Sequence, residues 1–334
     1  MMKKKLIGRL GLILLAAISG MLLVFGVLEQ ILLPADTVPG RDSDTAENSA
    51  RVFYNNTWYA PVESLETILI LGIDTSESTA SADTAKDGMG QADFLELLIL
   101  DKAAQEFQLL HLNRDTMAEI FQTDLYGRDA GSFRGQLALA HAYGRDPNDG
   151  CRQTVKSVET LLYGISIDHY ISFTMDAVSI LNDRVGGVTL SLMDDFTHLD
   201  PAYQEGTVVT LTGTQALAYV RERGALEDST NLRRMERQRQ YLDGLFKAYN
   251  ETAAAGEDTF SVDALLEVND YMISDCTADQ LSSLTATLQQ YTYTGIRTLE
   301  GQAVKGHTYV EFHLDESAAQ QTVLELFYTP VTEE

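Results

Sequence analysis

Continuous apolar runs recur along the middle of the chain and predict buried strands. They cover residues 67–73, 94–100 and 107–112, with shorter runs at 169–173 and 188–192. Apolar residues at helical spacing predict helices over 136–143, 149–163, 176–185, 214–219 and 232–249. Strands without a polar face that alternate with helices predict an α/β fold, in which helices cover both faces of a mostly buried central sheet as α/β/α layers.

The N-terminus has a different pattern. Residues 1–9 are basic, and residues 10–33 are almost wholly apolar, which is long enough to cross a bilayer as one transmembrane helix. The basic flank places the N-terminus in the cytoplasm and the remainder outside the cell. A cleaved signal peptide is the alternative, but residues 28–33 offer no small-x-small cleavage site. We therefore expect a single-pass signal anchor at 10–33 in the cell membrane.

Composition divides the rest of the chain into three parts. Residues 34–66 contain Pro34, Pro39, Gly40 and a polar run, and they predict an extracytoplasmic linker. Residues 67–250 carry the alternating strands and helices of the main domain. Residues 251–334 are expected to form a helix-rich C-terminal extension that packs on this domain and contains a late strand near 308–312.

The charge is strongly negative. The net charge is −25, and because residues 1–28 hold four basic and no acidic residues, residues 29–334 carry −29. A domain of this charge excludes non-specific binding of nucleic acid, whose backbone is itself polyanionic.

The chain contains two cysteines, Cys151 and Cys276. In an extracellular domain an even number of thiols favours a disulfide, which could contribute roughly 4–5 kcal/mol if unstrained. Two buried free thiols are the alternative.

Two groups of polar residues could carry chemistry. In the first, Asp74, Asp93, Arg114 and Asp115 lie where predicted strands begin or end. Sites in layered α/β sheets form where loops leave the strands, and two carboxylates there could hold a hard cation such as Mg²⁺. On residue type alone, simple capping of turns by Asp74 and Asp93 is the more economical interpretation.

The second group is a cluster of arginines in the segment 221–239, which has no lysine and a net charge of +2. Its members are Arg221, Arg223, Arg233, Arg234, Arg237 and Arg239. The guanidinium fork matches phosphate oxygens better than an ammonium does, so the cluster favours a phosphate site. Arg234 and Gln238, four residues apart, would share one helical face. A solvated helix face with local Glu–Arg pairs is the alternative.

Several motifs in a fixed order resemble the LytR–CpsA–Psr family of cell-wall polymer ligases. They are LGID at 71–74, AD at 92–93, LNRDT at 112–116, AHAYG at 140–144, IDHY at 167–170, VGGV at 185–188, LTGTQALAYVRER at 211–223 and RMERQ at 234–238. The resemblance covers about residues 67–249.

The resemblance implies a Mg²⁺-dependent phosphotransferase, with Mn²⁺ as an alternative ion. The family transfers a glycopolymer phosphate from an undecaprenyl-pyrophosphate carrier to peptidoglycan. The lipid tail of this carrier would lie in an apolar tunnel of the protein. By resemblance Asp74 and Asp93 would hold the metal, and Asp115 would orient Arg114 or deprotonate the acceptor hydroxyl. The pyrophosphate clamp would comprise Arg114, Arg221, Arg223, Arg234 and Gln238.

Two positions depart from the family pattern. Gln91 stands where an arginine is usual, and Gln136 falls near a usual lysine. Both changes remove positive charge from the expected phosphate site. They keep two further hypotheses open beside the ligase: a binding or regulatory envelope protein with weakened catalysis, and a polyprenyl-pyrophosphate hydrolase that uses water as acceptor.

Overall fold

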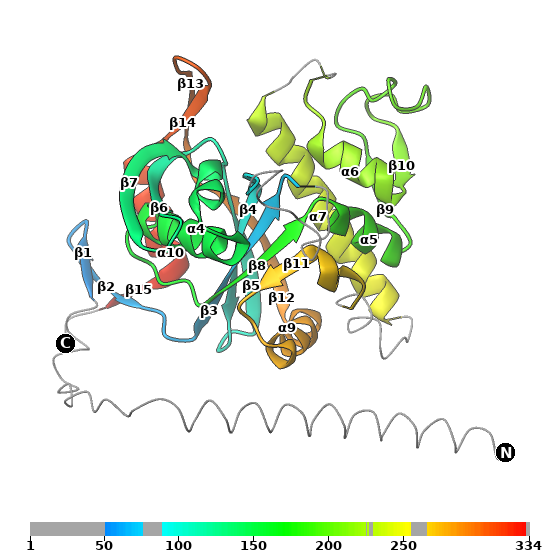
Figure 1. Cartoon of the computed structure of the whole chain (residues 1–334). Helices are drawn as coiled ribbons and strands as arrows, with labels where there is room; N and C mark the ends of the chain where they lie inside the picture. Colours follow the sequence, from blue (N-terminus) through cyan, green and yellow to red (C-terminus); the bar gives the residue numbers. More distant parts are fainter. Residues whose placement is uncertain (1–50, 76–88, 225, 227–229, 255–265, 332–334) are drawn as a thin grey trace, which may run out of the picture. The chain divides into compact units, whose positions relative to one another are not determined.

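A six-stranded mixed sheet lies at the centre of the fold (Figure 1). The computed structural model describes residues 51–75, 89–224, 226, 230–254 and 266–331. The strand order is β11-β8-β3-β4-β5-β12, in which β4 is antiparallel to both β3 and β5, and β8 and β12 run parallel to their inner neighbours. Its strands are β3 (Leu65–Ile73), β4 (Ala92–Asp101), β5 (Glu106–Leu112), β8 (His169–Thr174), β11 (Met272–Ser274) and β12 (Thr292–Thr298).

Apolar side chains of the sheet are buried on both faces, which is why the inner strands read as unbroken hydrophobic runs. On one face Leu71 and Leu97 pack with residues of α4 (Pro147–Leu161) and α10 (Glu316–Phe327). The hairpin of β6 (Met117–Thr123) and β7 (Asp129–Gln136) contributes to the same cluster. On the other face Ile68 and Leu98 pack with α9 (Ala278–Gln290).

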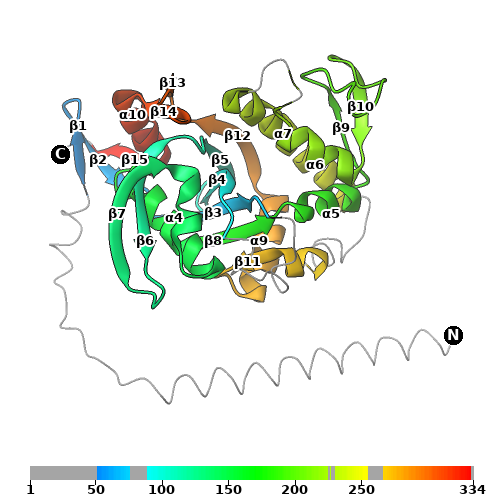
Figure 2. The same cartoon turned by 45° about the horizontal axis from the view of Figure 1, so that its top comes forward.

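A second cluster of helices stands beside the sheet (Figure 2) and carries five of the six arginines of the segment 221–239. It consists of α5 (Asp176–Arg184), α6 (Gly213–Arg221) and α7 (Asn231–Ala254), with the hairpin of β9 (Val188–Ser191) and β10 (Val208–Leu211). Tyr219 and Tyr241 are buried in its core. A capping box between Thr212 and Gln215 starts α6, so that Arg221 falls in its last turn.

The strands expected at 67–73, 94–100, 107–112, 169–173 and 188–192 are present as β3, β4, β5, β8 and β9. The helix expected at 136–143 is wrong. Gln136 ends strand β7, and two short 3₁₀ turns follow, η1 (Leu137–Leu139) and η2 (His141–Tyr143). The backbone N–H of Leu137 donates to the carbonyl of Thr116 at 2.8 Å, and that of Ala138 to Arg114 at 2.9 Å. These tertiary contacts override the helical preference of the segment and tie it to the loop of Arg114.

The expected boundaries at both ends of the main domain also need correction. Part of the predicted linker forms β1 (Val52–Tyr54) and β2 (Thr57–Pro61), and β2 pairs with the last strand, β15 (Tyr328–Val331). The C-terminal segment is part of the main domain, because it supplies β11 and β12, the two edge strands of the central sheet. It also forms a hairpin of β13 (Gly301–Lys305) and β14 (Val310–Leu314). Residues 52–334 accordingly form one unit.

The disulfide favoured from the sequence is not formed, and both cysteines are free thiols. Cys151 is buried in the apolar cluster on the α4 face of the sheet, whereas Cys276 packs against the cluster on the α9 face. The two cysteines therefore pack on opposite faces of the central sheet.

None of the helices in the described part of the chain has the length and apolar character needed to cross a membrane. The anchor expected at residues 10–33 lies outside the described residues.

A buried pair of titratable groups, Glu96 and His111, faces the α9 side of the sheet. They are cross-strand partners on β4 and β5, with His111 Nδ1 lying 3.6 Å from Glu96 Oε2. Both side chains are almost inaccessible, and both Glu96 oxygens lack a hydrogen-bond partner. Burial raises the pKa of Glu96 well above its usual value, and burial with the nearby Arg239 lowers the pKa of His111 to about 3. Both shifts favour the uncharged form of the side chain.

Replacing Glu96 by glutamine is expected to stabilise the protein at pH 8 and to have little effect near pH 4. The stability that a carboxyl of raised pKa contributes is present below its unfolded pKa and is lost as the pH rises toward its folded pKa. A neutral amide avoids that loss. The expected gain at pH 8 is about 1–3 kcal/mol, or roughly 3–8 °C in Tm.

Thermal unfolding between pH 4 and pH 8 measures this effect. Glu106→Gln, an exposed change in β5, is the matched control and should leave Tm unchanged. An equal gain for Glu96→Gln at every pH would show that titration of Glu96 is not the cause.

Candidate active site

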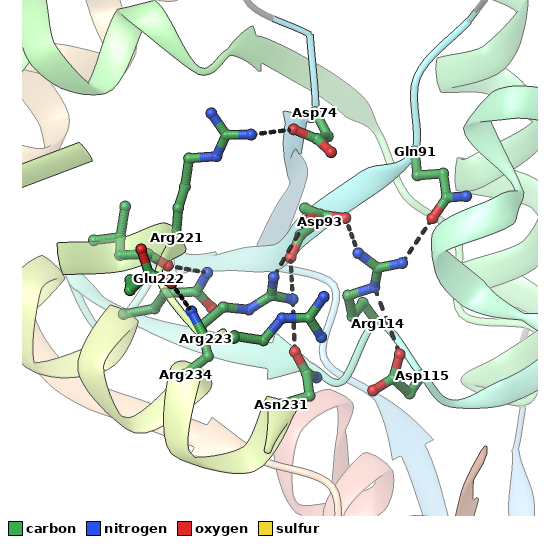
Figure 3. A network of polar contacts seen from close by, with 12 residues as sticks. Asp74, Gln91, Asp93, Arg114, Asp115, Arg221, Glu222, Arg223, Asn231 and Arg234 are labelled. Atoms are coloured by element: carbon green, nitrogen blue, oxygen red, sulfur yellow. Dashed lines mark hydrogen bonds and ion pairs between the residues drawn. The ribbon is translucent and has the colours of Figure 1, made fainter. Parts of the chain in front are cut away.

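A β-bulge places Asp93 at the end of the β3–β4 hairpin where the connecting loop joins the two strands. Gly72 pairs with Phe94 and Ile73 pairs with Ala92, so Asp93 has no partner across the hairpin. Bulges of this kind redirect a side chain next to functional sites. Asp74 follows β3 directly, and its backbone N–H donates to the carbonyl of Gln91 at 2.9 Å. Both carboxylates therefore leave the same end of the sheet (Figure 3).

Arg114, just after β5, is held by groups on three sides. Its Nη1 donates to Oδ1 of Asp93, and its Nη2 donates to Oε1 of Gln91 at 2.7 Å. Its Nε lies 3.5 Å from Oδ1 of Asp115. Burial lowers the pKa of Arg114, partly offset by Asp115. The guanidinium is thus fixed in orientation before any ligand binds.

Arg234, in the first turn of α7, binds the other oxygen of Asp93. Its Nη1 donates to Oδ2 of Asp93 at 3.2 Å, and its Nη2 donates to Oδ1 of Asn231 at 2.6 Å. Burial, followed by the positive charges of Arg223 and Arg114, lowers the pKa of Arg234 to about 9. Burial is the larger cause of this shift, and the repulsion from the two neighbouring guanidinium groups is the part that a bound anion would relieve.

Arg221 and Arg223 complete the cluster from the end of α6 (Figure 3). Arg221 Nη2 donates to Oδ1 of Asp74 at 2.7 Å, and each side chain is 46 % exposed, so this pair is easily opened. Within the described residues the guanidinium of Arg223 has no hydrogen-bond or ion-pair partner. It lies close enough to Arg114, Asp115 and Arg234 to shift their pKa values.

Asp115 is buried beneath these arginines. Its Oδ1 accepts a hydrogen bond from Nε2 of Gln136 at 3.0 Å. Burial raises the pKa of Asp115, while the charges of Arg114, Arg234 and Arg223 act in the opposite direction. A carboxylate with a raised pKa in a pocket is a candidate proton acceptor.

The structure divides the arginine cluster of the sequence into two sets. Arg233 and Arg237 both bind Asp194, at 2.8 Å and 2.7 Å, and so hold α7 to the loop after β9. Arg221, Arg223 and Arg234 instead gather with Arg114, from outside that segment, around the carboxylates of Asp74 and Asp93. Arg239 belongs to neither set and lies near Glu96 and His111.

Two apolar cavities lead away from this polar cluster. The first, of about 240 Å³, is lined by Asp93, Arg221, Arg234 and Gln238 among apolar residues such as Phe94. The second, of about 560 Å³, shares the lining residues Phe173, Leu181 and Leu245 with the first. Gln238 therefore lies in the cavity wall, and its Nε2 donates to the carbonyl of Val220 at 3.3 Å.

The expected metal site can be tested against the donor set. Asp74 and Asp93 offer carboxylate oxygens, the ligands that Mg²⁺ prefers. Each carboxylate has about four lone-pair positions, and its arginine contacts leave some of them open. The residues present therefore fit a hard divalent cation.

A different group of potential metal ligands does not fit. His169, Asp275 and Cys276 have donor atoms within 4.8 Å of one another. Gln280 Oε1 accepts from the N–H of Thr277, which turns Gln280 Nε2 toward Nε2 of His169 at 3.0 Å. That ring nitrogen must then accept, which leaves the proton on Nδ1, facing Asp275 at 3.5 Å. In this tautomer Nδ1 has no free lone pair, so the group as it stands does not offer a complete set of ligands.

Two asparagines of the network were not assigned to the site from the sequence. Asn113 Oδ1 accepts from Nδ2 of Asn231 at 2.7 Å and from the N–H of Asp115 at 2.9 Å. Asn231 is the first residue of α7. In the sequence, only the position of Asn113 directly before Arg114 indicates that this asparagine belongs to the site.

Comparison with known proteins identifies the family. The LytR_cpsA_psr family model matches residues 41–326. The chain belongs to the LytR–CpsA–Psr family. The match extends over the strands, the arginine cluster and the C-terminal segment, so the family includes the whole of the site described above.

Relatives of this LytR–CpsA–Psr protein carry a functional name. The polyisoprenyl-teichoic acid–peptidoglycan teichoic acid transferase TagU of Halalkalibacterium halodurans is 32 % identical over 54 % of this chain, and the match spans 52 % of its own length. TagU of Oceanobacillus iheyensis is 28 % identical over 90 % of this chain and 84 % of its own length. The solved structure of TagT bound to LI-WTA has a TM-score of 0.58 at 20 % identity, covering 79 % of this chain and 90 % of that one, and it shares the fold.

Proposed function

We propose that this protein transfers a glycopolymer phosphate from a polyprenyl-pyrophosphate carrier to peptidoglycan. One observation carries the proposal: four arginines gather at the polar end of an apolar cavity and outnumber the three aspartates among them. An anionic headgroup with an apolar tail matches this combination. The names of the relatives support a polymer of the teichoic acid type.

In the proposed complex the pyrophosphate replaces part of the internal ion pairing. Arg114, Arg221, Arg223 and Arg234 would contact its oxygens, because guanidinium groups bind phosphate bidentately. The pair between Arg221 and Asp74 is exposed and opens at little cost. Mg²⁺ held by Asp74 and Asp93 would supply charge neutralisation on the pyrophosphate.

The transfer step follows from the position of Asp115. The acceptor hydroxyl oxygen forms a bond to the phosphorus that bears the glycopolymer, and the bond from that phosphorus to the bridging oxygen breaks. Polyprenyl phosphate leaves, a phosphodiester forms, and Asp115 takes the hydroxyl proton. Phosphoryl transfer depends mainly on positioning and charge stabilisation, which fixed arginines supply.

The lipid tail is proposed to enter the two joined apolar cavities beside α5 and α7. A membrane anchor at residues 10–33 would raise the local concentration of a donor that is itself a membrane lipid. Flotation of the full-length chain with lipid vesicles checks this anchor, and failure to float would contradict it.

The two departures from the family pattern fit within the hydrogen-bond network. Gln91 accepts from Arg114, which an arginine at this position could not do. Gln136 donates to Asp115. These contacts orient the two residues that touch the reacting groups, so they favour an active transferase over a protein that only binds.

The test is a transfer assay with the full-length chain in detergent. The donor is a polyprenyl-pyrophosphate-linked saccharide and the acceptor a short peptidoglycan glycan, with and without Mg²⁺, and mass spectrometry detects the products. We expect a phosphodiester-linked product that requires both acceptor and Mg²⁺. Cleavage of the donor at the same rate without acceptor would instead identify a hydrolase. Donor binding without any product would identify a binding protein.

A further inference from the structure

A second, polar pocket adjoins the arginine cluster and shares no lining residue with the apolar cavity. It has a volume of about 280 Å³. Its floor is formed by Arg114, Asp115, Gln136 and Arg223. Arg234, which lines the apolar cavity, contacts Asp93 from one side, and Arg114 contacts it from the other. The arginine cluster therefore lies between an apolar space and a polar one.

One wall of this pocket belongs to the C-terminal hairpin of β13 and β14. The N–H of Phe312 donates to the carbonyl of Asp115 at 2.9 Å. Gln136 Nε2 donates both to the carbonyl of Val310, at 2.8 Å, and to the carboxylate of Asp115. These bonds fix the hairpin directly on the residue proposed to accept the proton.

The rim of the pocket is apolar where its floor is polar. Tyr309, at the turn of the hairpin, is 43 % exposed, and the neighbouring Val310 is also exposed. Leu232 of α7 is exposed on the same pocket. Sugars combine hydroxyl and amide groups with apolar ring faces, so one aromatic and two aliphatic side chains over a floor of Arg, Asp and Gln match a saccharide.

The volume limits what can enter. Pockets for drug-sized ligands have about 300–1,000 Å³, so about 280 Å³ holds roughly one sugar ring. A longer glycan would cross the exposed rim at Tyr309 and continue into solvent.

We infer that this pocket is the acceptor subsite, which binds one N-acetylhexosamine of a peptidoglycan glycan and brings its hydroxyl to Asp115. The inference rests on the proposed function and extends it to the acceptor. The acceptor hydroxyl and the leaving polyprenyl phosphate then lie on opposite sides of the phosphorus, as in-line displacement requires. Tyr309 is the residue that contacts the glycan without contacting the donor.

The variant Tyr309→Ala tests the assignment in the full-length protein. We expect the KM for a tetrasaccharide of alternating N-acetylglucosamine and N-acetylmuramic acid to rise about tenfold. The affinity for the polyprenyl-pyrophosphate donor should not change, because Tyr309 lies outside the apolar cavity. Tyr309→Phe retains the ring and should restore most of the acceptor affinity.

Tyr126→Ala is the matched control, because Tyr126 is an exposed tyrosine in the turn of another hairpin. An acceptor KM for Tyr309→Ala equal to that of Tyr126→Ala would overturn the inference.

Direct binding separates this inference from the proposed function. Saturation-transfer NMR with the same tetrasaccharide needs no turnover. A signal in the wild type that is lost in Tyr309→Ala supports the pocket even if the wild type transfers nothing, in which case only the proposed function fails. A signal unchanged by the substitution overturns the pocket even if transfer is observed.

Discussion

Replacing Asp93 by asparagine is expected to lower the rate of transfer by about 10²–10³-fold or more. Each oxygen of Asp93 orients one arginine, Arg114 on one side and Arg234 on the other. An asparagine presents an oxygen to one guanidinium and an NH₂ group to the other, so one arginine must turn away. The substitution also removes one of the two proposed metal ligands.

Donor binding is expected to respond in the opposite direction. Asp93→Asn removes a negative charge from a cationic pocket, so affinity for polyprenyl pyrophosphate in EDTA should stay equal or increase. Asp124→Asn, in the exposed turn between β6 and β7, is the control and should leave both quantities unchanged. A transfer rate within tenfold of the wild type would refute the role of Asp93 in positioning the two arginines.

Replacing Arg237 by methionine is expected to lower the free energy of unfolding by about 3–5 kcal/mol. The Arg237 side chain is completely buried. Its nitrogens donate to the carbonyls of Tyr219 and Glu222 as well as to Asp194. Methionine fills part of the volume but leaves the partly buried carboxylate of Asp194 with one partner fewer and two carbonyls without this donor. In a domain of this size the corresponding fall in Tm is roughly 10 °C.

Chemical denaturation of the full-length protein measures the effect. Arg297→Met on β12 is the matched control, because Arg297 and its partner Glu325, at 2.6 Å, are 41 % and 45 % exposed and the pair lies on the surface. The control should lose less than about 1 kcal/mol. Equal losses in the two variants would contradict a structural role for the contact between Arg237 and Asp194.

The central strands could be predicted because burial on both faces leaves a continuous apolar run, as in residues 67–73. The same logic failed at Gln136, where a run of leucines and alanines has helical propensity but its backbone bonds go to Thr116 and Arg114. Local propensity cannot anticipate a partner that is distant in sequence. The small strands β2 and β12 were missed for a similar reason, since they pair with β15 and β5, which are far away along the chain.

The sequence predicted which residues belong to the candidate site. It did not predict how their side chains are arranged in space. Motif order singled out Asp74, Asp93, Arg114 and Arg234, and the structure brings these side chains into one network. Arg237 has a structural role, in which it joins α7 to α6 and to Asp194. This role depends on how the two helices pack, and the number of arginines in the segment does not predict it. The disulfide between Cys151 and Cys276 was favoured because the number of cysteines is even. That number does not show on which face of the sheet each thiol packs.

The order of strands in the central sheet also constrains how the chain reaches its fold. Both edge strands, β11 and β12, come from the last quarter of the sequence, and β15 pairs with β2 across nearly the whole chain. Pairings between such distant segments form slowly, because each closes a long loop. Until residues 272–298 are available, the outer edges of β8 and β5 present unpaired backbone groups that can template association between chains. The interval before the chain is complete is therefore the stage at which this protein is most exposed to aggregation.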